Sequence, residues 1–439
     1  MTFFKTTSAM RFLTAITLYR LLLPLLFIAA FPGWLVKMLR RGGFGTRLGE
    51  RAAIYSTPLE FEPCGAVHFH AVSVGESMLA LKLIREWLLR EPGRRFVLAT
   101  GTATGHAVAT AAHISGLRVT YAPLDFPSIV RRYLNRFEPS QIVLIEAEVW
   151  PHFLQTCERR CIPVRLVNAR MSPRSARRFQ RFAAWLRPLY RLLDAVAIQE
   201  AEDATIWETL GVAQEKIHHT GSLKFDPASG ARPQHRPEFQ AILNSFGSHR
   251  PVILAASTHA GEEAFIAGAI RTANPEALAV IAPRHAERRA EVILDLENAG
   301  FLVKLRSSEL AATGDRRTVL VIDSTGELGD WTAHADAVII GKSFLATGGQ
   351  NPCEAILAEK PVIFGPHMEN FQPLASRLIA SDGSISASGP DELARALSAA
   401  LDPQKAHTMT RNASALLARH EGATQRILAL LGAGNTPII

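Results

Sequence analysis

The chain alternates short runs of β-branched and apolar residues with longer amphipathic runs, and this alternation occurs twice. It is typical of parallel βα units, in which a helix connects each strand to the next. The first series of expected strands is 66–71, 96–100, 118–122, 141–145, 164–168 and 195–199. The second series is 252–256, 278–282, 301–304, 319–322, 337–341 and 362–364. The pattern therefore predicts an α/β protein with two doubly wound domains facing a cleft, where ligands bind beyond the carboxyl ends of the strands.

A proline-bearing polar stretch separates the two series. Its sequence, DPASGARPQHRP at 226–237, is typical of an interdomain linker. We expect a membrane anchor with a basic juxtamembrane segment at 1–51, a first domain at 52–225, the linker at 226–250 and a second domain at 251–439. With 439 residues, of which 48% are hydrophobic, the chain can build two full cores, and this composition excludes a disordered protein.

The N-terminal segment 12–36 is apolar apart from Arg20, and its uncharged run covers 21–36. Because about 20 residues are needed to cross a hydrocarbon core, this segment spans a membrane only if Arg20 lies near the headgroups. A cleaved signal peptide, a single-pass anchor and an interfacial helix are the alternatives. The sequence FPGW at 31–34, followed by Lys37, is a poor cleavage site and favours an anchor or an interfacial helix.

Positive charge is concentrated at this end of the chain. The first 51 residues hold eight Lys or Arg and one acid, so they carry +7 of the formal net charge of +8. The basic residues are denser after the apolar segment than before it, which predicts a cytoplasmic globular part. The high net charge does not by itself imply nucleic-acid binding, because it belongs to one terminal segment. The four cysteines, Cys64, Cys157, Cys161 and Cys353, agree with a reducing compartment and offer no second pair of metal ligands.

Polar or glycine-rich clusters follow the expected strands, at the edge where a parallel sheet binds its ligand. They are 73–76, 100–105, 146–148, 257–262, 283–285 and 341–354. The sequence GTATG lacks the dinucleotide spacing and the phosphate-loop lysine, so use of nicotinamide or ATP is not predicted. Glu76 is either an ordinary first-turn residue, stabilised by the helix dipole, or a general base. Of Glu146 and Glu148, we expect one functional acid and one cap for the helix that starts near Pro151.

In the second half, the sequence TGGQNPCEA at 347–355 indicates a loop that opens a helix at Pro352. Backbone N–H groups at such a helix start bind phosphate, and Glu354 in the first turn can hold ribose hydroxyls. Arg284 either adds a cation for the phosphate or is a surface residue.

The stretch from Arg159 to Arg191 contains ten arginines and no acid. Phe179, Phe182, Trp185, Leu186 and Leu189 recur between them at helical spacing. This pattern is typical of a helix at an anionic membrane surface, and a core-facing helix with solvated arginines would give the same apolar stripe. Nucleic-acid binding is a third and weaker interpretation, because the chain also carries a membrane segment.

Eleven ordered stretches of the chain resemble the Kdo (3-deoxy-D-manno-octulosonic acid) transferases, which attach Kdo to the lipid A precursor of Gram-negative outer membranes. They are RLGER (47–51), HAVSVGE (70–76), PLDFP (123–127), EAEVWP (146–151), NARMSPRS (168–175), GSLKFD (221–226), ASTHAGEE (256–263), PRHAER (283–288), DSTGELGDW (323–331), GGQNPCEA (348–355) and GPHMENF (365–371). The resemblance implies a GT-B fold of two Rossmann-like domains, a CMP-Kdo donor and an inverting transfer to a sugar hydroxyl of the lipid. It also implies a chain anchored at the cytoplasmic face of the inner membrane.

The resemblance further implies roles for individual residues. The catalytic base falls on Glu76, and the proposed transition-state stabilisers fall on Glu146 and Lys224. The CMP contacts fall on Pro283, Arg284, Gly326, Glu327, Leu328, Asn351, Pro352, Cys353 and Glu354. The chain departs from the common family pattern at Lys342, where a glycine is usual, and at Cys353, where a leucine is usual.

The chemistry of the reaction fits these residue types. An inverting transfer needs a base on the face opposite the leaving phosphate, which would be Glu76. Fixed donors and a cation, Lys224 or Arg284, would stabilise the phosphate, so no metal and no cofactor are expected. We expect the basic N-terminal and Arg-rich segments to bind anionic membrane lipids and the phosphates of the lipid A precursor. The alternatives are another GT-B enzyme, such as a UDP-sugar transferase or a 2-epimerase, and a membrane-anchored sugar-nucleotide binding protein without turnover.

Overall fold

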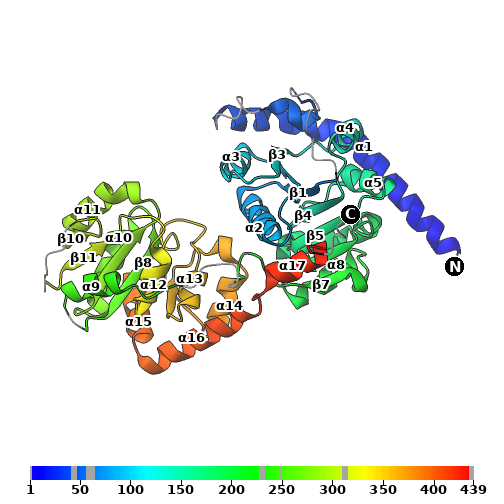
Figure 1. The fold of residues 1–439 in the computed structure, drawn as a ribbon. Coiled ribbons are helices and arrows are strands. Elements are labelled where there is room, and N and C mark those ends of the chain that lie inside the picture. The colour runs from blue at the N-terminus through cyan, green and yellow to red at the C-terminus, as the bar shows by residue number, and fades with distance from the viewer. Residues whose placement is uncertain are drawn as a thin grey trace. The chain divides into compact units, whose positions relative to one another are not determined.

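The computed structural model describes residues 2–40, 47–55, 65–226, 233–247, 249–308 and 315–434. Cys64 and part of the expected linker, 227–232, lie outside the described residues. The chain divides into two compact units (Figure 1). Unit 1 comprises Met1–Asp226 together with Gly422–Ile439, and unit 2 is Pro227–Glu421.

Unit 1 is built on a parallel sheet of seven described strands in the order β3-β2-β1-β4-β5-β6-β7. The strands are β1 (Val67–Ala71), β2 (Phe96–Thr100), β3 (Leu117–Tyr121), β4 (Gln141–Ile145), β5 (Val164–Ala169), β6 (Ala195–Ile198) and β7 (Ile217–His219). Its main helices are α2 (Val74–Arg90), α3 (Ala103–Ala111), α4 (Pro127–Phe137), α5 (Pro151–Arg159), α6 (Pro173–Arg181), α7 (Ala183–Tyr190) and α8 (Ala204–Thr209). Every residue of β1, β2 and β4 is buried, as expected for strands covered by helices on both faces.

Unit 2 repeats this architecture, with seven described parallel strands in the order β10-β11-β9-β8-β12-β13-β14. The strands are β8 (Val252–Thr258), β9 (Leu278–Pro283), β10 (Leu302–Leu305), β11 (Thr318–Val321), β12 (Ala337–Ile340), β13 (Val362–Phe364) and β14 (Ile385–Ser386). Its helices include α9 (Pro237–Ser245), α10 (Glu262–Ala273), α11 (Arg289–Asn298), α12 (Leu328–Ala333), α13 (Cys353–Leu357), α14 (Leu374–Ala380), α15 (Pro390–Ala400) and α16 (Pro403–Ala418). The predicted fold class, two doubly wound α/β domains, is confirmed.

The C-terminal helix α17 (Ala423–Leu431) belongs to unit 1, although the sequence analysis assigned it to the second domain. It is drawn in red in Figure 1 and packs against α2. Ile427, Leu428 and Leu431 join the apolar core that lies between α2 and the sheet. Asp226 fixes the start of this helix, because its carboxylate accepts the N–H of Thr424 at 2.7 Å. The apolar stripe of α17 predicts burial but does not specify which core it enters.

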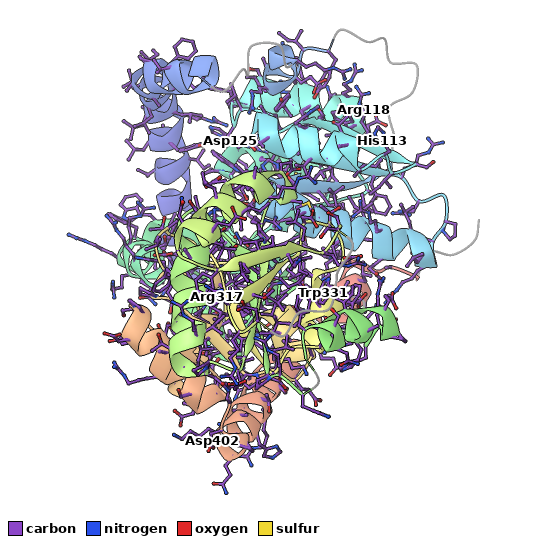
Figure 2. All side chains as sticks on the ribbon, turned by 90° about the vertical axis from the view of Figure 1, so that its left-hand side faces the viewer. His113, Arg118, Asp125, Arg317, Trp331 and Asp402 are labelled. Carbon is purple, nitrogen blue, oxygen red and sulfur yellow. The ribbon has the colours of Figure 1, made fainter. Side chains whose placement is uncertain are left out.

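Helix α9 lies within the segment 226–250 that the sequence analysis treated as linker. Phe239 of this helix stacks on Trp331, with ring centroids 4.1 Å apart, and both side chains are fully buried (Trp331 is labelled in Figure 2). The helix has only nine residues and begins at a proline, directly after a polar stretch that also contains prolines. The sequence pattern therefore resembles a linker. Helix α9 is nonetheless part of the unit 2 core.

An apolar helix, α1 (Thr2–Arg40), precedes the sheet of unit 1, as predicted. Its window Ile16–Gly33 has a mean hydropathy of 1.7, and only 6% of it is buried. The hydroxyl of Tyr19 donates to Oδ2 of Asp125 at 3.0 Å, and its ring lies 5.0 Å from that of His152. Through these contacts α1 is attached to the start of α5, because Asp125 also accepts the N–H groups of His152 and Phe153.

Candidate active site

Glu76 lies in the first turn of α2, directly after the carboxyl end of β1. Ser73 caps this helix: its Oγ accepts the N–H of Glu76 at 3.2 Å and donates to Oε1 of Glu76 at 2.7 Å. The N–H of Val72 donates to Oε2 at 2.8 Å. This is a capping-box arrangement, and Glu76 is 8% exposed. Glu76 is thus a helix-cap residue whose carboxylate is fixed at the ligand-binding edge of the sheet.

Two further acids lie at this edge, after the carboxyl end of β4. Burial and the charge of Glu76 raise the pKa of Glu146, whereas Arg170 and Lys224 lower it. Burial and Glu76 raise the pKa of Glu148 to about 7, with a smaller contribution from Glu146. The Nε1–H of Trp150 opposes this rise by donating to Oε2 of Glu148 at 3.1 Å. We call Glu76, Glu146 and Glu148 the acid cluster.

The expectation that Glu146 or Glu148 caps the helix at Pro151 is wrong. Helix α5 does begin at Pro151, but neither acid supplies a side-chain cap to it. Asp125 does so instead, since its two carboxylate oxygens accept the N–H groups of His152 at 3.0 Å and Phe153 at 2.8 Å. The cap comes from a residue 27 positions away in sequence, where local patterning does not reveal it.

Basic side chains accompany the acid cluster. Lys224 and Arg170 both lower the pKa of Glu146, which places their charges near its carboxylate. Lys224 belongs to a loop held by Asn168, whose Oδ1 accepts the N–H of Leu223 at 2.9 Å. Lys82 of α2 donates to the carbonyl of the same Leu223 at 2.5 Å. The structure thus brings together the three residues expected in catalysis and adds Arg170, which the sequence analysis did not single out.

Unit 2 carries a pocket of about 80 Å³ at the carboxyl ends of β8 and β12. Four of the residues expected to contact CMP line it: Arg284, Leu328, Asn351 and Glu354. Burial raises the pKa of Glu354, and the nearby charge of Arg284 opposes that rise. The pocket therefore joins a cation, a carboxyl group and amide side chains, which can hold a phosphate and sugar hydroxyls.

The other residues expected to contact CMP are not among those that line this pocket in the described part of the chain. Pro283 ends β9, and Gly326 is an exposed residue with a left-handed φ of 84°. Glu327 accepts from the Ser324 hydroxyl at 2.5 Å and pairs with Arg306 at 3.6 Å. Pro352 and Cys353 are buried at the start of α13.

The helix start expected at Pro352 is shorter than the sequence suggests. Helix α13 has only five residues, and the N–H of Cys353 already donates to Oδ1 of Asn351 at 3.1 Å. A one-turn helix has a small dipole. Arg284 is therefore a stronger candidate than this helix start for a contact with a phosphate.

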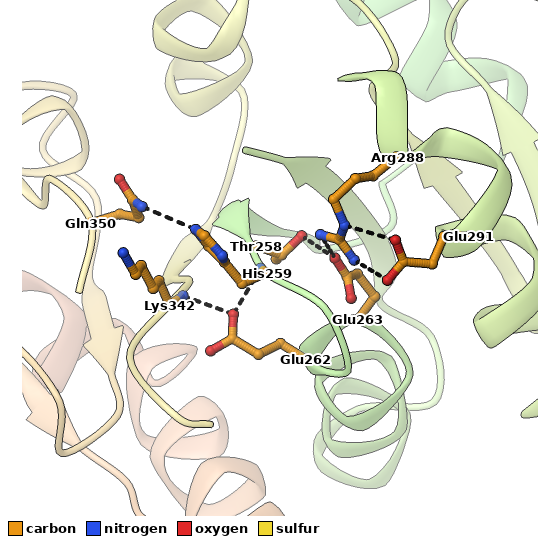
Figure 3. Close-up of polar contacts among 8 residues, drawn as sticks. All are labelled: Thr258, His259, Glu262, Glu263, Arg288, Glu291, Lys342 and Gln350. Carbon is orange, nitrogen blue, oxygen red and sulfur yellow. Dashed lines mark hydrogen bonds and ion pairs between the residues drawn. The ribbon is translucent and has the colours of Figure 1, made fainter. Parts of the chain in front are cut away.

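Two buried glutamates, Glu262 and Glu263, organise the loops around the pocket (Figure 3). Oε2 of Glu262 accepts the N–H groups of His259 at 3.0 Å and Lys342 at 2.7 Å. Its Oε1 accepts those of Ser343 and Phe344, both at 3.1 Å. Glu262 thus binds the loop after β12 to the loop after β8. Neither its burial nor its partners could be read from the sequence, although the polar cluster 257–262 indicated a site.

Glu263 forms a second buried contact network. Its Oε1 accepts from the hydroxyl of Thr258 at 3.0 Å and pairs with Arg288 at 3.0 Å. Arg288 also pairs with Glu291 at 2.9 Å. Lys342, at a position where the resemblance leads us to expect a glycine, has a left-handed φ of 55°, a conformation that suits glycine. Its backbone keeps that conformation because Glu262 accepts its N–H and because its carbonyl accepts the N–H of Gly349 at 3.0 Å.

Within the described residues, no group of three or more His, Cys, Asp or Glu side chains is arranged to hold a metal ion. The expectation that the reaction needs neither metal nor cofactor stays a prediction.

Comparison with known proteins assigns the chain to a family. Residues 46–227 match the family model described as 3-deoxy-D-manno-octulosonic-acid transferase (kdotransferase). The 3-deoxy-D-manno-octulosonic acid transferase of Bordetella pertussis is 35% identical over 418 residues, covering 90% of this chain and 94% of that protein. The chain belongs to the Kdo transferase family. It is therefore a glycosyltransferase, and the predicted family is confirmed.

Other relatives agree with this assignment. The Kdo transferase of Haemophilus influenzae is 31% identical, covering 88% of this chain and 90% of that protein. A putative UDP-N-acetylglucosamine 2-epimerase from Listeria monocytogenes has a similar fold, with a TM-score of 0.53 at 13% identity, and covers 85% of this chain and 98% of that one. At this identity the likeness concerns the fold alone. The GT-B fold of the Kdo transferase is thus shared with enzymes of different chemistry.

Proposed function

We propose that this chain transfers Kdo from CMP-Kdo to a hydroxyl group of the lipid A precursor (lipid IVA), with inversion, in lipopolysaccharide core biosynthesis. The observation that carries the proposal is the fixed carboxylate of Glu76 at the carboxyl end of β1, in a member of the Kdo transferase family. Two hydrogen bonds hold it in one orientation, as a general base requires.

In the proposed step Glu76 takes the proton of the acceptor hydroxyl as its oxygen attacks the anomeric carbon of Kdo. The new C–O bond forms on the face opposite the leaving group, and the bond from that carbon to the CMP phosphate oxygen breaks with both electrons going to CMP. Burial and the charge of Glu76 raise the pKa of Glu148 to about 7, which favours its neutral form and so reduces the like charge around Glu76.

Cations stabilise the negative charge that develops on the leaving phosphate. We assign this role to Lys224 in unit 1 and Arg284 in unit 2, with Glu146 helping to orient Lys224. The donor's nucleotide binds the unit 2 edge that carries Pro283, Gly326, Glu327, Leu328, Asn351, Pro352, Cys353 and Glu354. The acid cluster and the pocket belong to different units, so the proposed reaction needs both. Protein groups fill these roles without a metal.

Helix α1 supplies the proposed anchor at the cytoplasmic face of the inner membrane, as its apolar window Ile16–Gly33 and the basic residues after it suggest. The exposed arginines of α6 are the proposed contacts with anionic lipids. These features favour a lipid acceptor over a soluble one and over nucleic acid.

Mass analysis of the lipid product tests this function. The full chain in lipid vesicles, incubated with CMP-Kdo and the lipid A precursor, should add the mass of Kdo to the lipid and release CMP. The same mixture with UDP-sugars in place of CMP-Kdo should give no new lipid mass. Transfer from a UDP-sugar would support another GT-B activity, and nucleotide binding without any transfer would support a non-catalytic binding protein.

A further inference from the structure

An apolar pocket of about 420 Å³ lies where α1 meets α7 in unit 1. Leu18 and Leu22 of α1 form one wall, Leu186 and Leu189 of α7 form another, and Pro151 closes it at the start of α5. The contacts of Tyr19 with Asp125 and His152 hold α1 to the start of α5, where Pro151 lies. The pocket is therefore a built feature of unit 1.

Large apolar side chains at this pocket remain in contact with solvent. Phe182 is 51% exposed and Trp185 is 46% exposed, and both line it together with Leu18, which is 52% exposed. Such a concentration of exposed apolar surface marks a binding site for an apolar partner.

Positive charge lies on α6, the helix that ends just before the pocket residue Phe182. Arg174, Arg177, Arg178 and Arg181 of α6 are exposed, and none of them has an ion pair with a described residue. Arg181 directly precedes Phe182. An apolar interior near arginines that form no ion pair with a described residue is complementary to a ligand that has both an apolar chain and an anionic phosphate group.

The pocket also adjoins the acid cluster along the chain. Its wall residue Pro151 is three positions after Glu148, so their Cα atoms lie within about 11 Å of each other even if the chain is fully extended. A lipid chain in the pocket would therefore keep its headgroup near Glu148 of the acid cluster. Bulk phospholipid has no chemical role at this position, whereas the acceptor does.

We propose that this pocket binds an acyl chain of the phosphorylated glycolipid acceptor, while the arginines of α6 contact its phosphate. The inference rests on the proposed function, because it names the part of the acceptor that unit 1 recognises. Recognition of the acceptor then depends on its acyl chain as well as on its sugar.

The test uses two substitutions on neighbouring residues of α1. Leu22→Trp fills the pocket, and Leu21→Trp is the matched control, since Leu21 is 67% exposed and does not line it. Loss of space for about two methylene groups should raise KM for the acylated acceptor about tenfold in Leu22→Trp. The KM for the same phosphorylated disaccharide without acyl chains should not change. An unchanged KM for the acylated acceptor, or an equal rise for both acceptors, would overturn the inference.

A binding measurement separates this inference from the proposed function, because it needs no turnover. Trp185 lines the pocket, and its fluorescence is the part of the emission that is lost in Trp185→Phe. Acceptor with brominated acyl chains, in vesicles of unbrominated anionic phospholipid, should quench this part of the emission. Leu22→Trp should abolish this quenching of Trp185, whereas Leu21→Trp should keep it. Equal quenching by brominated phospholipid at the same mole fraction, without acceptor, would assign the pocket to bulk lipid and overturn the inference. Quenching without any Kdo transfer would leave the pocket supported and refute the proposed function.

Discussion

Ser73 and Glu76 hold each other at the start of α2: the hydroxyl of Ser73 donates to the carboxylate of Glu76 at 2.7 Å and accepts the N–H of Glu76 at 3.2 Å. The same pair therefore stabilises the helix and orients the proposed base. This double use explains why the two interpretations of Glu76 from the sequence are compatible. A residue can be an N-terminal cap and a catalytic group at once, provided that one carboxylate oxygen remains within reach of the substrate.

Ser73→Ala should weaken both functions of this pair. Loss of the helix cap should cost about 1 kcal/mol of stability, and the less ordered carboxylate should also lower kcat. The control is Asp402→Ala in unit 2, which removes a comparable cap, the acceptor of the Lys405 N–H at 3.0 Å (Asp402 is labelled in Figure 2). Thermal unfolding measures the loss of stability in both variants, and kcat shows whether Ser73 also orients Glu76. If both variants lose stability equally and both keep full kcat, Ser73 has no role in orienting Glu76.

The pKa of Glu148 should fall when Glu76 is neutralised. Burial and Glu76 raise it to about 7 in the native protein, so Glu76→Gln removes one of these causes. Between the ordinary pKa of about 4.3 and 7 the folded state binds more protons than the unfolded state, so this group's contribution to stability declines as pH rises through that range. Titration of the labelled Glu148 carboxyl by ¹³C NMR measures the shift. The same pKa in both proteins would mean that Glu76 and Glu148 do not interact.

Glu262→Gln should destabilise unit 2 and weaken CMP binding. The native carboxylate accepts four backbone N–H groups in a fully buried position, whereas an amide directs N–H donors at some of them. We expect a loss of about 3 kcal/mol in the free energy of unfolding. Glu297→Gln, at an exposed position of α11, should have no effect. Calorimetry of unfolding and of CMP binding provides the measurement, and native-like values for Glu262→Gln would contradict the role given to this residue.

Reversal of charge on α6 should weaken membrane association. The triple variant Arg177→Glu, Arg178→Glu and Arg181→Glu replaces three exposed cations beside the apolar pocket with anions, which anionic lipids repel. Sedimentation with anionic vesicles should therefore recover less of the variant than of the native chain, and added salt should reduce the difference. The control makes the same change at Arg395, Arg411 and Arg419, which are exposed in unit 2. Equal sedimentation of both triple variants would remove α6 from the lipid interface.

The sequence predicts most strands of the fold because their β-branched and apolar runs are long enough to be distinctive. All twelve expected strands are present with ends that agree within one residue, apart from β8, whose carboxyl end lies two residues later than expected. Two short edge strands were missed, β7 (Ile217–His219) and β14 (Ile385–Ser386), because three or two residues carry no periodicity. Helix α9 was missed for a related reason, since a nine-residue helix beside a polar stretch resembles a linker.

The sequence could predict the placement of Glu76 and Glu146 at the carboxyl edge of the sheet, because each lies within five residues after the end of a strand. A role that depends on a distant partner was not predictable. Glu262 acts on backbone groups 80 to 82 positions away, and Asp125 caps a helix 27 positions away. Arg170 was counted only as one arginine of a basic stretch, because its proximity to Glu146 arises from the pairing of β4 with β5.

The central claim, that Glu76 is the base in Kdo transfer to a lipid hydroxyl, is tested most directly by the rate of CMP release from CMP-Kdo in the presence of the lipid A precursor. Native protein and Glu76→Gln should be compared after circular dichroism and CMP binding show that both are folded. We expect Glu76→Gln to retain its affinity for CMP and its kcat to fall by about 10²- to 10⁴-fold. A Glu76→Gln protein that turns over at the native rate would contradict it.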